Sequence, residues 1–286
     1  MARLFGMIGN RPDLGARALA LDSETLRVRS PDSPVGWGLG FYQGGEVLIR
    51  RRPVDERPDI DVAELASDVR ADVVIGQVRH ATTGDLRTEN THPFRYRQWL
   101  FAQTGTVPQF DQLRERLVLS VPEFLRSGIR GETDAEAMFH IFLSFLHDAG
   151  RLNDANADPS EVHEALRSTL TVLDGMTAEV GGGTNDLNLL VTNGEFIVAV
   201  HRSQSQEMRI HTLAGKSDAE LVIGDDTALR RRAPEIAQMH FSVVASDFDA
   251  QENVPAIKAT LARWKVIPPN SVVIMLRGKD PQIVPV

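Results

Sequence analysis

The sequence predicts a layered α+β fold. Short apolar runs punctuated by glycine, which are typical of strands, occupy the first 105 residues and return after residue 185. Between these regions the spacing of apolar residues changes to the helical period. Strands at both ends with helices in the middle favour a layered α+β or sandwich architecture over a doubly wound parallel sheet.

The first strands are marked by their glycines. LFGMIG and GWGLGFY are short apolar runs, and the second ends at Gly44-Gly45 before EVLIRR, which predicts a β-hairpin. An apolar, β-branched run over residues 71–82 predicts a buried strand and follows an amphipathic segment, DVAELASDVR. A further strand is expected over residues 99–105, where WLFAQTG ends in a glycine turn.

Two helices are predicted in the centre of the chain. Residues 133–150 begin with Thr133, carry Glu136 three positions later and show apolar residues at helical spacing, so we expect a capped helix that faces the core. Residues 159–176 predict a second helix, with Pro159 near its first position and Gly175 near its end.

The C-terminal part returns to strands. Asn193-Gly194 lies between two apolar runs and predicts a hairpin, and a second hairpin is expected over residues 207–223. HFSVVASDF, NVPAIKATLARWKVIPPN and SVVIMLRG continue this strand-rich pattern. Because no repeat or linker divides the chain, we expect one domain over residues 1–286.

Composition restricts the classes of function. The net charge of −8 argues against nucleic-acid binding, and the arginine triplets 50–52 and 230–232 are expected in solvated turns. No apolar stretch approaches a membrane span or an export signal, so a soluble, cytoplasmic protein is expected. Only four of the 31 basic residues are lysine, a bias that hints at a bacterial source. The absence of cysteine excludes disulfides, zinc–thiolate sites and thiol catalysis.

Reactive side chains concentrate in residues 76–107. Arg79 follows an apolar strand, where its planar guanidinium could bind a carboxylate or pair with an acid of the fold. Thr82, beside Thr83-Gly84, could supply a hydroxyl or simply form a loop. His80 and His92 could act as bases, but their spacing does not predict a metal site.

Two further segments could contribute to a site. Gln103-Thr104-Gly105 ends a strand at a glycine, where a backbone N–H can point toward an anionic oxygen. Asp134 and Glu136 open the first predicted helix, where acids either cap the helix or serve a site.

These motifs occur together in one order: MARLFG, GWGLGFY, VRHATTG, NTHPF, WLFAQTG, TDAE, VVASDF and WKVIPPNSVVIM. In this order the chain resembles the class II glutamine amidotransferases, which are N-terminal nucleophile hydrolases. It is most similar to their compact stand-alone branch that includes γ-glutamyl hydrolases. The resemblance spans nearly the whole chain and implies a four-layer αββα sandwich without a cofactor.

The resemblance also assigns roles residue by residue. It implies that Arg79 holds the α-carboxylate of glutamine and that Asp134 holds its ammonium group. It also implies that Thr82 belongs to the substrate site with these two residues. Gly105 is expected to donate a backbone N–H to the oxyanion hole. The chain departs from the family pattern at Ala2, where the catalytic cysteine belongs, at Thr104, where an asparagine belongs, and at Gln103, which replaces a histidine.

Three interpretations follow. The chain is a natural pseudoenzyme that keeps a pocket for glutamine or a γ-glutamyl compound, or an active enzyme whose cysteine was exchanged for Ala2, or a purely structural subunit. Departures at Thr104 and Gln103 as well as at Ala2 favour the first, since an engineered trap would leave the oxyanion hole intact. The resemblance suggests, as a further partner, a synthetase on a separate chain. Neither a nucleic acid nor a membrane is expected as a partner.

Overall fold

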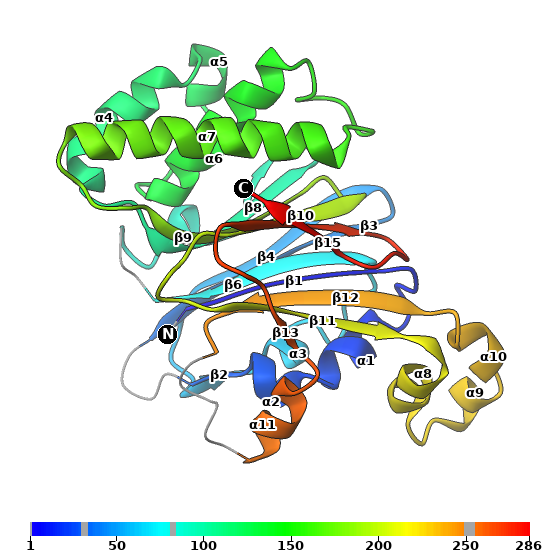
Figure 1. The fold of residues 1–286 in the computed structure, drawn as a ribbon. Coiled ribbons are helices and arrows are strands. Elements are labelled where there is room, and N and C mark those ends of the chain that lie inside the picture. Colours follow the sequence, from blue (N-terminus) through cyan, green and yellow to red (C-terminus); the bar gives the residue numbers. More distant parts are fainter. Residues whose placement is uncertain (1, 30–33, 81–83, 249–254) are drawn as a thin grey trace.

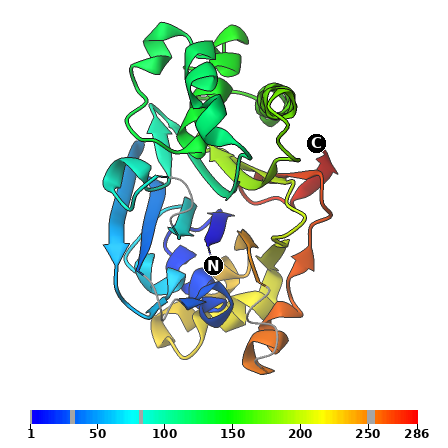
Figure 2. The ribbon, with the colours of Figure 1, turned by 90° about the vertical axis from the view of Figure 1, so that its left-hand side faces the viewer.

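Two antiparallel β-sheets face each other between two layers of helices (Figures 1 and 2). The computed structural model describes residues 2–29, 34–80, 84–248 and 255–286. One sheet has seven strands, in the order β13 (Lys265–Val266), β11 (Met208–Ala214), β12 (His240–Ser246), β1 (Arg3–Gly9), β6 (Val73–Arg79), β3 (Val35–Gln43) and β4 (Glu46–Asp55). The other has six, in the order β15 (Gln282–Pro285), β14 (Ser271–Leu276), β10 (Phe196–His201), β9 (Asp186–Thr192), β8 (Trp99–Thr106) and β7 (Phe94–Tyr96). A short pair, β2 (Val28–Arg29) and β5 (Asp59–Ile60), stands apart from them.

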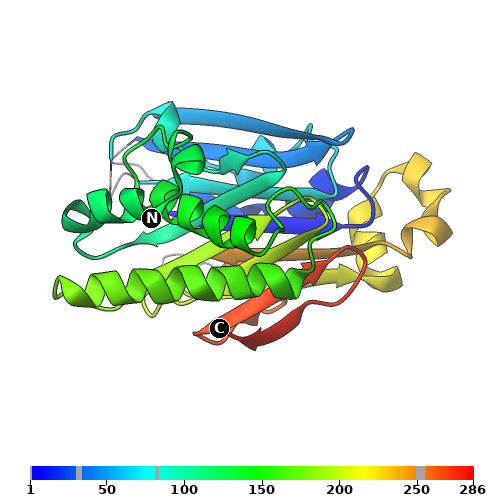
Figure 3. The ribbon, with the colours of Figure 1, turned by 90° about the horizontal axis from the view of Figure 1, so that it is seen from above.

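The helices cover the outer faces of the two sheets. The six-stranded sheet carries α4 (Phe110–Ser120), α5 (Glu123–Arg126), α6 (Asp134–Asp148) and α7 (Pro159–Glu179), seen from above in Figure 3. The opposite layer contains α1 (Gly15–Ala20), α2 (Ser23–Leu26), α3 (Val62–Leu65), α8 (Gly215–Ile223), α9 (Thr227–Arg230), α10 (Ala233–Ile236) and α11 (Pro255–Leu261). This arrangement confirms the predicted α+β class and the four-layer αββα sandwich.

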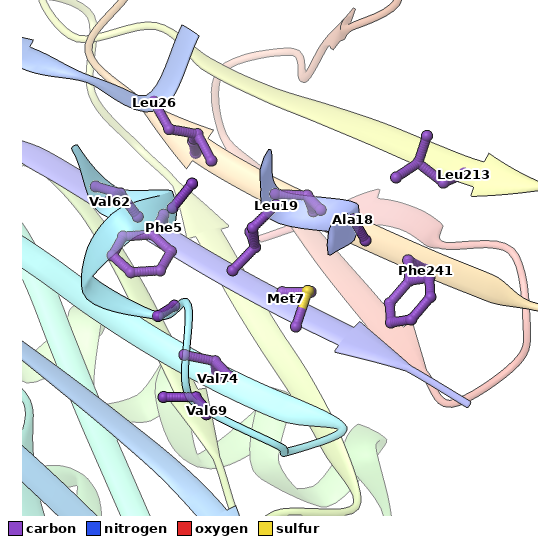
Figure 4. Packing of buried hydrophobic residues seen from close by; sticks show 14 of the residues in the cluster. Phe5, Met7, Ala18, Leu19, Leu26, Val62, Val69, Val74, Leu213 and Phe241 are labelled. Carbon is purple, nitrogen blue, oxygen red and sulfur yellow. The ribbon is translucent and has the colours of Figure 1, made fainter. Parts of the chain in front are cut away.

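Both faces of strand β1 are buried, which explains its apolar sequence. Leu4 and Ile8 pack between the two sheets, whereas Phe5 and Met7 pack on the helices of the outer layer (Figure 4). Successive side chains of a strand point to opposite faces, so a strand with both faces buried becomes a continuous apolar run. Ala2 directly precedes this strand, in the middle of the seven-stranded sheet.

The two predicted helices and the hairpins at Gly44-Gly45 and Asn193-Gly194 are confirmed, with adjusted details. The Thr133 hydroxyl accepts a hydrogen bond from the Glu136 N–H at 3.2 Å and so caps α6. The Glu136 carboxylate binds the N–H groups of Arg130 and Gly131 at 2.9 and 2.6 Å, which fixes the loop that leads into α6. Helix α7 continues past Gly175 to Glu179. The hairpins at Gly44-Gly45 and Asn193-Gly194 pair as expected.

The hairpin expected over residues 207–223 is wrong. Strand β11 pairs with β12 instead, and the chain after it forms helix α8. Ala219, Val222 and Ile223 recur at helical spacing and are buried on one face, which outweighs the strand-like composition. The strand-rich pattern near the C-terminus is interrupted in the same way by α11.

Helix α4 and the whole second helical layer were not predicted. The segments α1, α2 and α3 are only 4 to 6 residues long, too short to show a helical period in the sequence.

The arginine triplet at residues 50–52 lies within strand β4 and not in a turn. Arg50 pairs with Asp68 on the exposed side at 2.6 Å. Arg51 points the other way and donates a hydrogen bond to the Pro93 carbonyl, and burial lowers the pKa of its guanidinium. Because successive side chains of a strand point to opposite faces, Arg50 and Arg51 lie in different environments although they are adjacent in the sequence.

Within the described ranges, none of the helices combines the length and the apolar content that crossing a bilayer demands.

Candidate functional site

A cavity of about 440 Å³ opens at the end of the sandwich where β1 begins and β8 ends. Figure 2 looks toward this end of the molecule. The cavity is lined by five of the six residues that the sequence predicts for the site, namely Ala2, Arg79, Thr104, Gly105 and Asp134. The sixth, Thr82, lies outside the described residues. Segments that are far apart in the sequence therefore meet at one place.

Arg79 is the last residue of β6, and its side chain is 5% exposed. One Nη donates to the carbonyl oxygen of Asp85 at 3.2 Å and the other to that of Gly84 at 3.0 Å. Burial lowers the pKa of this guanidinium, and the charge of Asp134 acts against that shift. The two carbonyls orient the planar guanidinium at the cavity wall.

Asp134 is the first residue of α6, and its side chain is 6% exposed. One carboxylate oxygen accepts from the Val107 N–H at 2.7 Å and the other from the Ala135 N–H at 2.9 Å. Burial raises the pKa of Asp134, while these backbone donors and Arg79 act to lower it. A carboxylate has about four acceptor positions, so both oxygens can accept further donors. Arg79 and Asp134 therefore present opposite charges to the same cavity.

The position expected for the nucleophile carries only a methyl group. Ala2 lines the cavity and is half-buried. Thr104 also lines the cavity. It is buried, and its hydroxyl has no hydrogen-bond partner in the part of the chain that the structure describes. The same holds, within those residues, for both polar atoms of the Gln103 side-chain amide. Satisfied groups are the rule inside proteins, so these buried polar atoms beside the cavity are exceptions to it.

Sequence reasoning missed several residues of the wall. Gln77, Ser205, Gln206 and Asp247 also line the cavity. Gln77 lies two positions before Arg79 on the same strand face, so strand periodicity could have identified it. Ser205 and Gln206 lie in the loop between β10 and β11, and nothing in their local sequence indicates a site.

His92 also lines the cavity, and its side chain is 4% exposed. Its ring contacts Phe94 edge-on at 4.7 Å between centroids. Among the described residues neither ring nitrogen has a hydrogen-bond partner. Burial, together with the charges of Arg79 and Arg51, holds the pKa of His92 well below its usual value. The imidazole is therefore neutral in the folded protein at neutral pH.

This depressed pKa predicts a loss of stability in acid. The unfolded histidine titrates near pH 6.5, so below that pH the unfolded chain binds a proton that folded His92 does not. The free energy of unfolding should fall as pH drops below about 6.5, by at most about 1.4 kcal/mol per pH unit from this residue. Urea unfolding at about pH 7.5 and about pH 5.5 should show a smaller drop for His92→Gln than for the wild type. His140, whose pKa is also lowered by burial, retains its own share in both proteins. Identical drops would rule out this account of His92.

Comparison with known proteins gives the family. The profile described as glutamine amidotransferases class-II matches residues 1–283. This chain belongs to the class II glutamine amidotransferases. The sequence resemblance is thereby confirmed over nearly the whole chain.

Relatives within the family agree. The amidotransferase-like chain is 25% identical over 217 residues to a probable glutamine amidotransferase of Saccharomyces cerevisiae, a match that covers 70% of this chain and 61% of the yeast protein. It is 27% identical over 242 residues to the isomerizing glutamine–fructose-6-phosphate aminotransferase of Streptococcus pyogenes, covering 78% of this chain and 35% of that enzyme. The match thus spans about three fifths of the yeast relative and about a third of the streptococcal one.

Solved structures share the fold. A glutamine aminotransferase class-II domain protein from Silicibacter pomeroyi matches with a TM-score of 0.57 at 16% identity and covers 99% of this chain and 98% of its own. The glutamine phosphoribosylpyrophosphate amidotransferase of B. subtilis matches with a TM-score of 0.56 at 14% identity, covering 99% of this chain and 49% of its own. At these identities the likeness concerns the fold alone.

Proposed function

We propose that this class II amidotransferase homologue binds glutamine or a γ-glutamyl compound by its α-amino-acid group and does not hydrolyse the amide. One observation carries the proposal. Arg79, Asp134 and Ala2 line one cavity, and Ala2 stands at the sequence position where the family resemblance expects the nucleophile.

Binding is supported by charge and shape. An α-amino acid presents a carboxylate and an ammonium group on the same carbon atom, and a guanidinium and a carboxylate complement these two charges. Arg79 and Asp134 are both buried and both line the cavity. A volume of about 440 Å³ falls within the usual range of small-molecule sites. Gln103 and Thr104 also line this cavity.

Loss of hydrolysis is supported by chemistry. The sequence contains no cysteine, and Ala2 has no group that can attack a carbonyl. Removing a covalent nucleophile costs on the order of 10⁶ in turnover, and losing one oxyanion donor costs roughly 10²–10³. The asparagine that the family places before Gly105 is Thr104 here, and its shorter side chain reaches less far.

The test is a calorimetric titration with glutamine, glutamate and a γ-glutamyl dipeptide. We expect saturable binding, and we expect Arg79→Ala to weaken it about 100-fold because charge-assisted hydrogen bonds to the ligand carboxylate are lost. Arg167→Ala, which removes an exposed arginine on α7, is the control and should leave the affinity unchanged. If the wild type shows no saturable heat at millimolar ligand, the protein is a structural subunit in which Arg79 and Asp134 only maintain the fold.

A further inference from the structure

A buried amide lies between the two charged residues of the site. Asn90 ends the short 3₁₀ helix Thr88–Asn90, and its side chain is 0% exposed. Its Nδ2 donates to the carbonyl oxygen of Asp85 at 3.0 Å. Its Oδ1 accepts from the N–H of Glu132 at 2.9 Å. One side chain therefore joins two segments that are more than forty residues apart in the sequence.

Each of these segments holds one charge of the site. The Asp85 carbonyl that accepts from Asn90 also accepts from the Arg79 guanidinium at 3.2 Å. Glu132 precedes Asp134 by two residues, in the loop that leads into α6. A carbonyl oxygen has two lone pairs, so it can serve both donors at once. The amide thus connects the carbonyl that orients Arg79 with the backbone that carries Asp134.

The surroundings hold this amide tightly. A Cβ atom at Gly84 would lie 2.7 Å from Asn90 Nδ2, and one at Gly131 would lie 2.4 Å from Asn90 Oδ1. Both glycines therefore let the backbone approach the amide closely. An ion pair between Arg87 and Glu132, at 2.8 Å, bridges the same two segments. Its side chains are 42% and 51% exposed, so water and salt weaken it, and the buried amide is the stronger link.

We infer that Asn90 is a positioning residue that sets the separation of Arg79 and Asp134 to fit the carboxylate and ammonium groups of an α-amino acid. The inference rests on the proposed function for the identity of the ligand. Both ligand charges sit on one carbon, so their spacing is fixed and the protein groups must match it closely. A link that holds both groups before the ligand arrives lowers the entropy lost on binding.

The test compares one substitution at two similar sites. Asn193, 7% exposed, donates from Nδ2 to the Ala155 carbonyl at 3.2 Å and accepts at Oδ1 from the Glu195 N–H at 3.0 Å. Asparagine to aspartate removes the donor at either site, keeps the acceptor and turns a carboxylate oxygen toward a carbonyl. We expect Asn90→Asp to weaken glutamine binding about tenfold and Asn193→Asp less than about twofold.

A double-mutant cycle separates positioning from a general loss of structure. Arg79→Lys keeps the charge but lacks the planar fork that the two carbonyls orient. If Asn90 acts through Arg79, adding Asn90→Asp to Arg79→Lys should weaken glutamine binding less than about twofold further. A full tenfold loss in that background, or equal losses for Asn90→Asp and Asn193→Asp, would overturn the inference. If Asn90→Asp does not fold, Asn90→Ser is used in the same cycle.

Hydrogen exchange without ligand tests the link independently of the proposed function. Peptides covering residues 84–90 and 128–136 should both exchange faster in Asn90→Asp, and neither should change in Asn193→Asp. Unchanged exchange, or a change in only one of the two segments, would contradict the coupling. If the wild type does not bind glutamine but exchange rises in both segments, the proposed function fails while the structural link stands.

Discussion

Ala2→Cys combined with Thr104→Asn is expected to release ammonia and glutamate from glutamine, at a rate about 10²–10³ above that of Ala2→Cys alone. The cysteine restores a thiol at the cavity that contains Arg79 and Asp134. The asparagine adds an amide donor beside Gly105, whose backbone N–H is the other oxyanion donor that the family resemblance implies. The rates are measured by coupling glutamate production to an indicator enzyme, with the mature N-terminus verified by mass spectrometry.

Thr104→Asn alone is the matched control and should be inactive because it has no nucleophile. Equal activity of Ala2→Cys and the double variant would mean that the Thr104 hydroxyl serves, beside the Gly105 N–H, as well as an asparagine amide. The thiol would then be the only missing part, as in an enzyme altered to trap its substrate. An inactive double variant that still binds glutamine would show that the cavity has lost more than these two groups, with Gln103 the next position to restore.

Gly105→Ala is expected to lower the free energy of unfolding by about 3 kcal/mol or more. Gly105 has φ of +93°, a backbone conformation that residues with a Cβ rarely adopt. A Cβ there would lie 2.0 Å from the Asp186 carbonyl oxygen and 2.8 Å from Leu187 Cα, on the paired strand β9. Backbone atoms of a central strand cannot move aside without breaking the sheet.

Gly183→Ala provides the comparison, because a Cβ at that exposed glycine would meet no atom within 4 Å. Its free energy of unfolding should stay within about 0.5 kcal/mol of the wild type. Both are measured by urea denaturation at neutral pH. Equal midpoints for the two variants would refute the steric account and leave Gly105 with a role in ligand binding only.

The sequence predicted those helices and hairpins whose signals lie within one short segment of the chain. The Thr133 cap and the apolar spacing after it predicted α6 because capping and periodicity are properties of one segment. Asn193-Gly194 predicted the β9–β10 hairpin for the same reason. The prediction of a hairpin after β11 was wrong because residues 215–223 form a helix whose apolar face packs on the core, and this packing depends on the tertiary structure.

The same distinction between local signals and tertiary packing applies to the candidate site. The sequence by itself determined which groups are available: Arg79, Asp134 and Gly105 in family order, and no thiol at Ala2. Only the tertiary structure decided that Gln77 and Asp247 share their cavity and that Asn90 joins the Arg79 and Asp134 segments. The physical reason is that residue identity fixes the chemistry of a group, whereas its partners depend on which distant segments the packing of two sheets brings together.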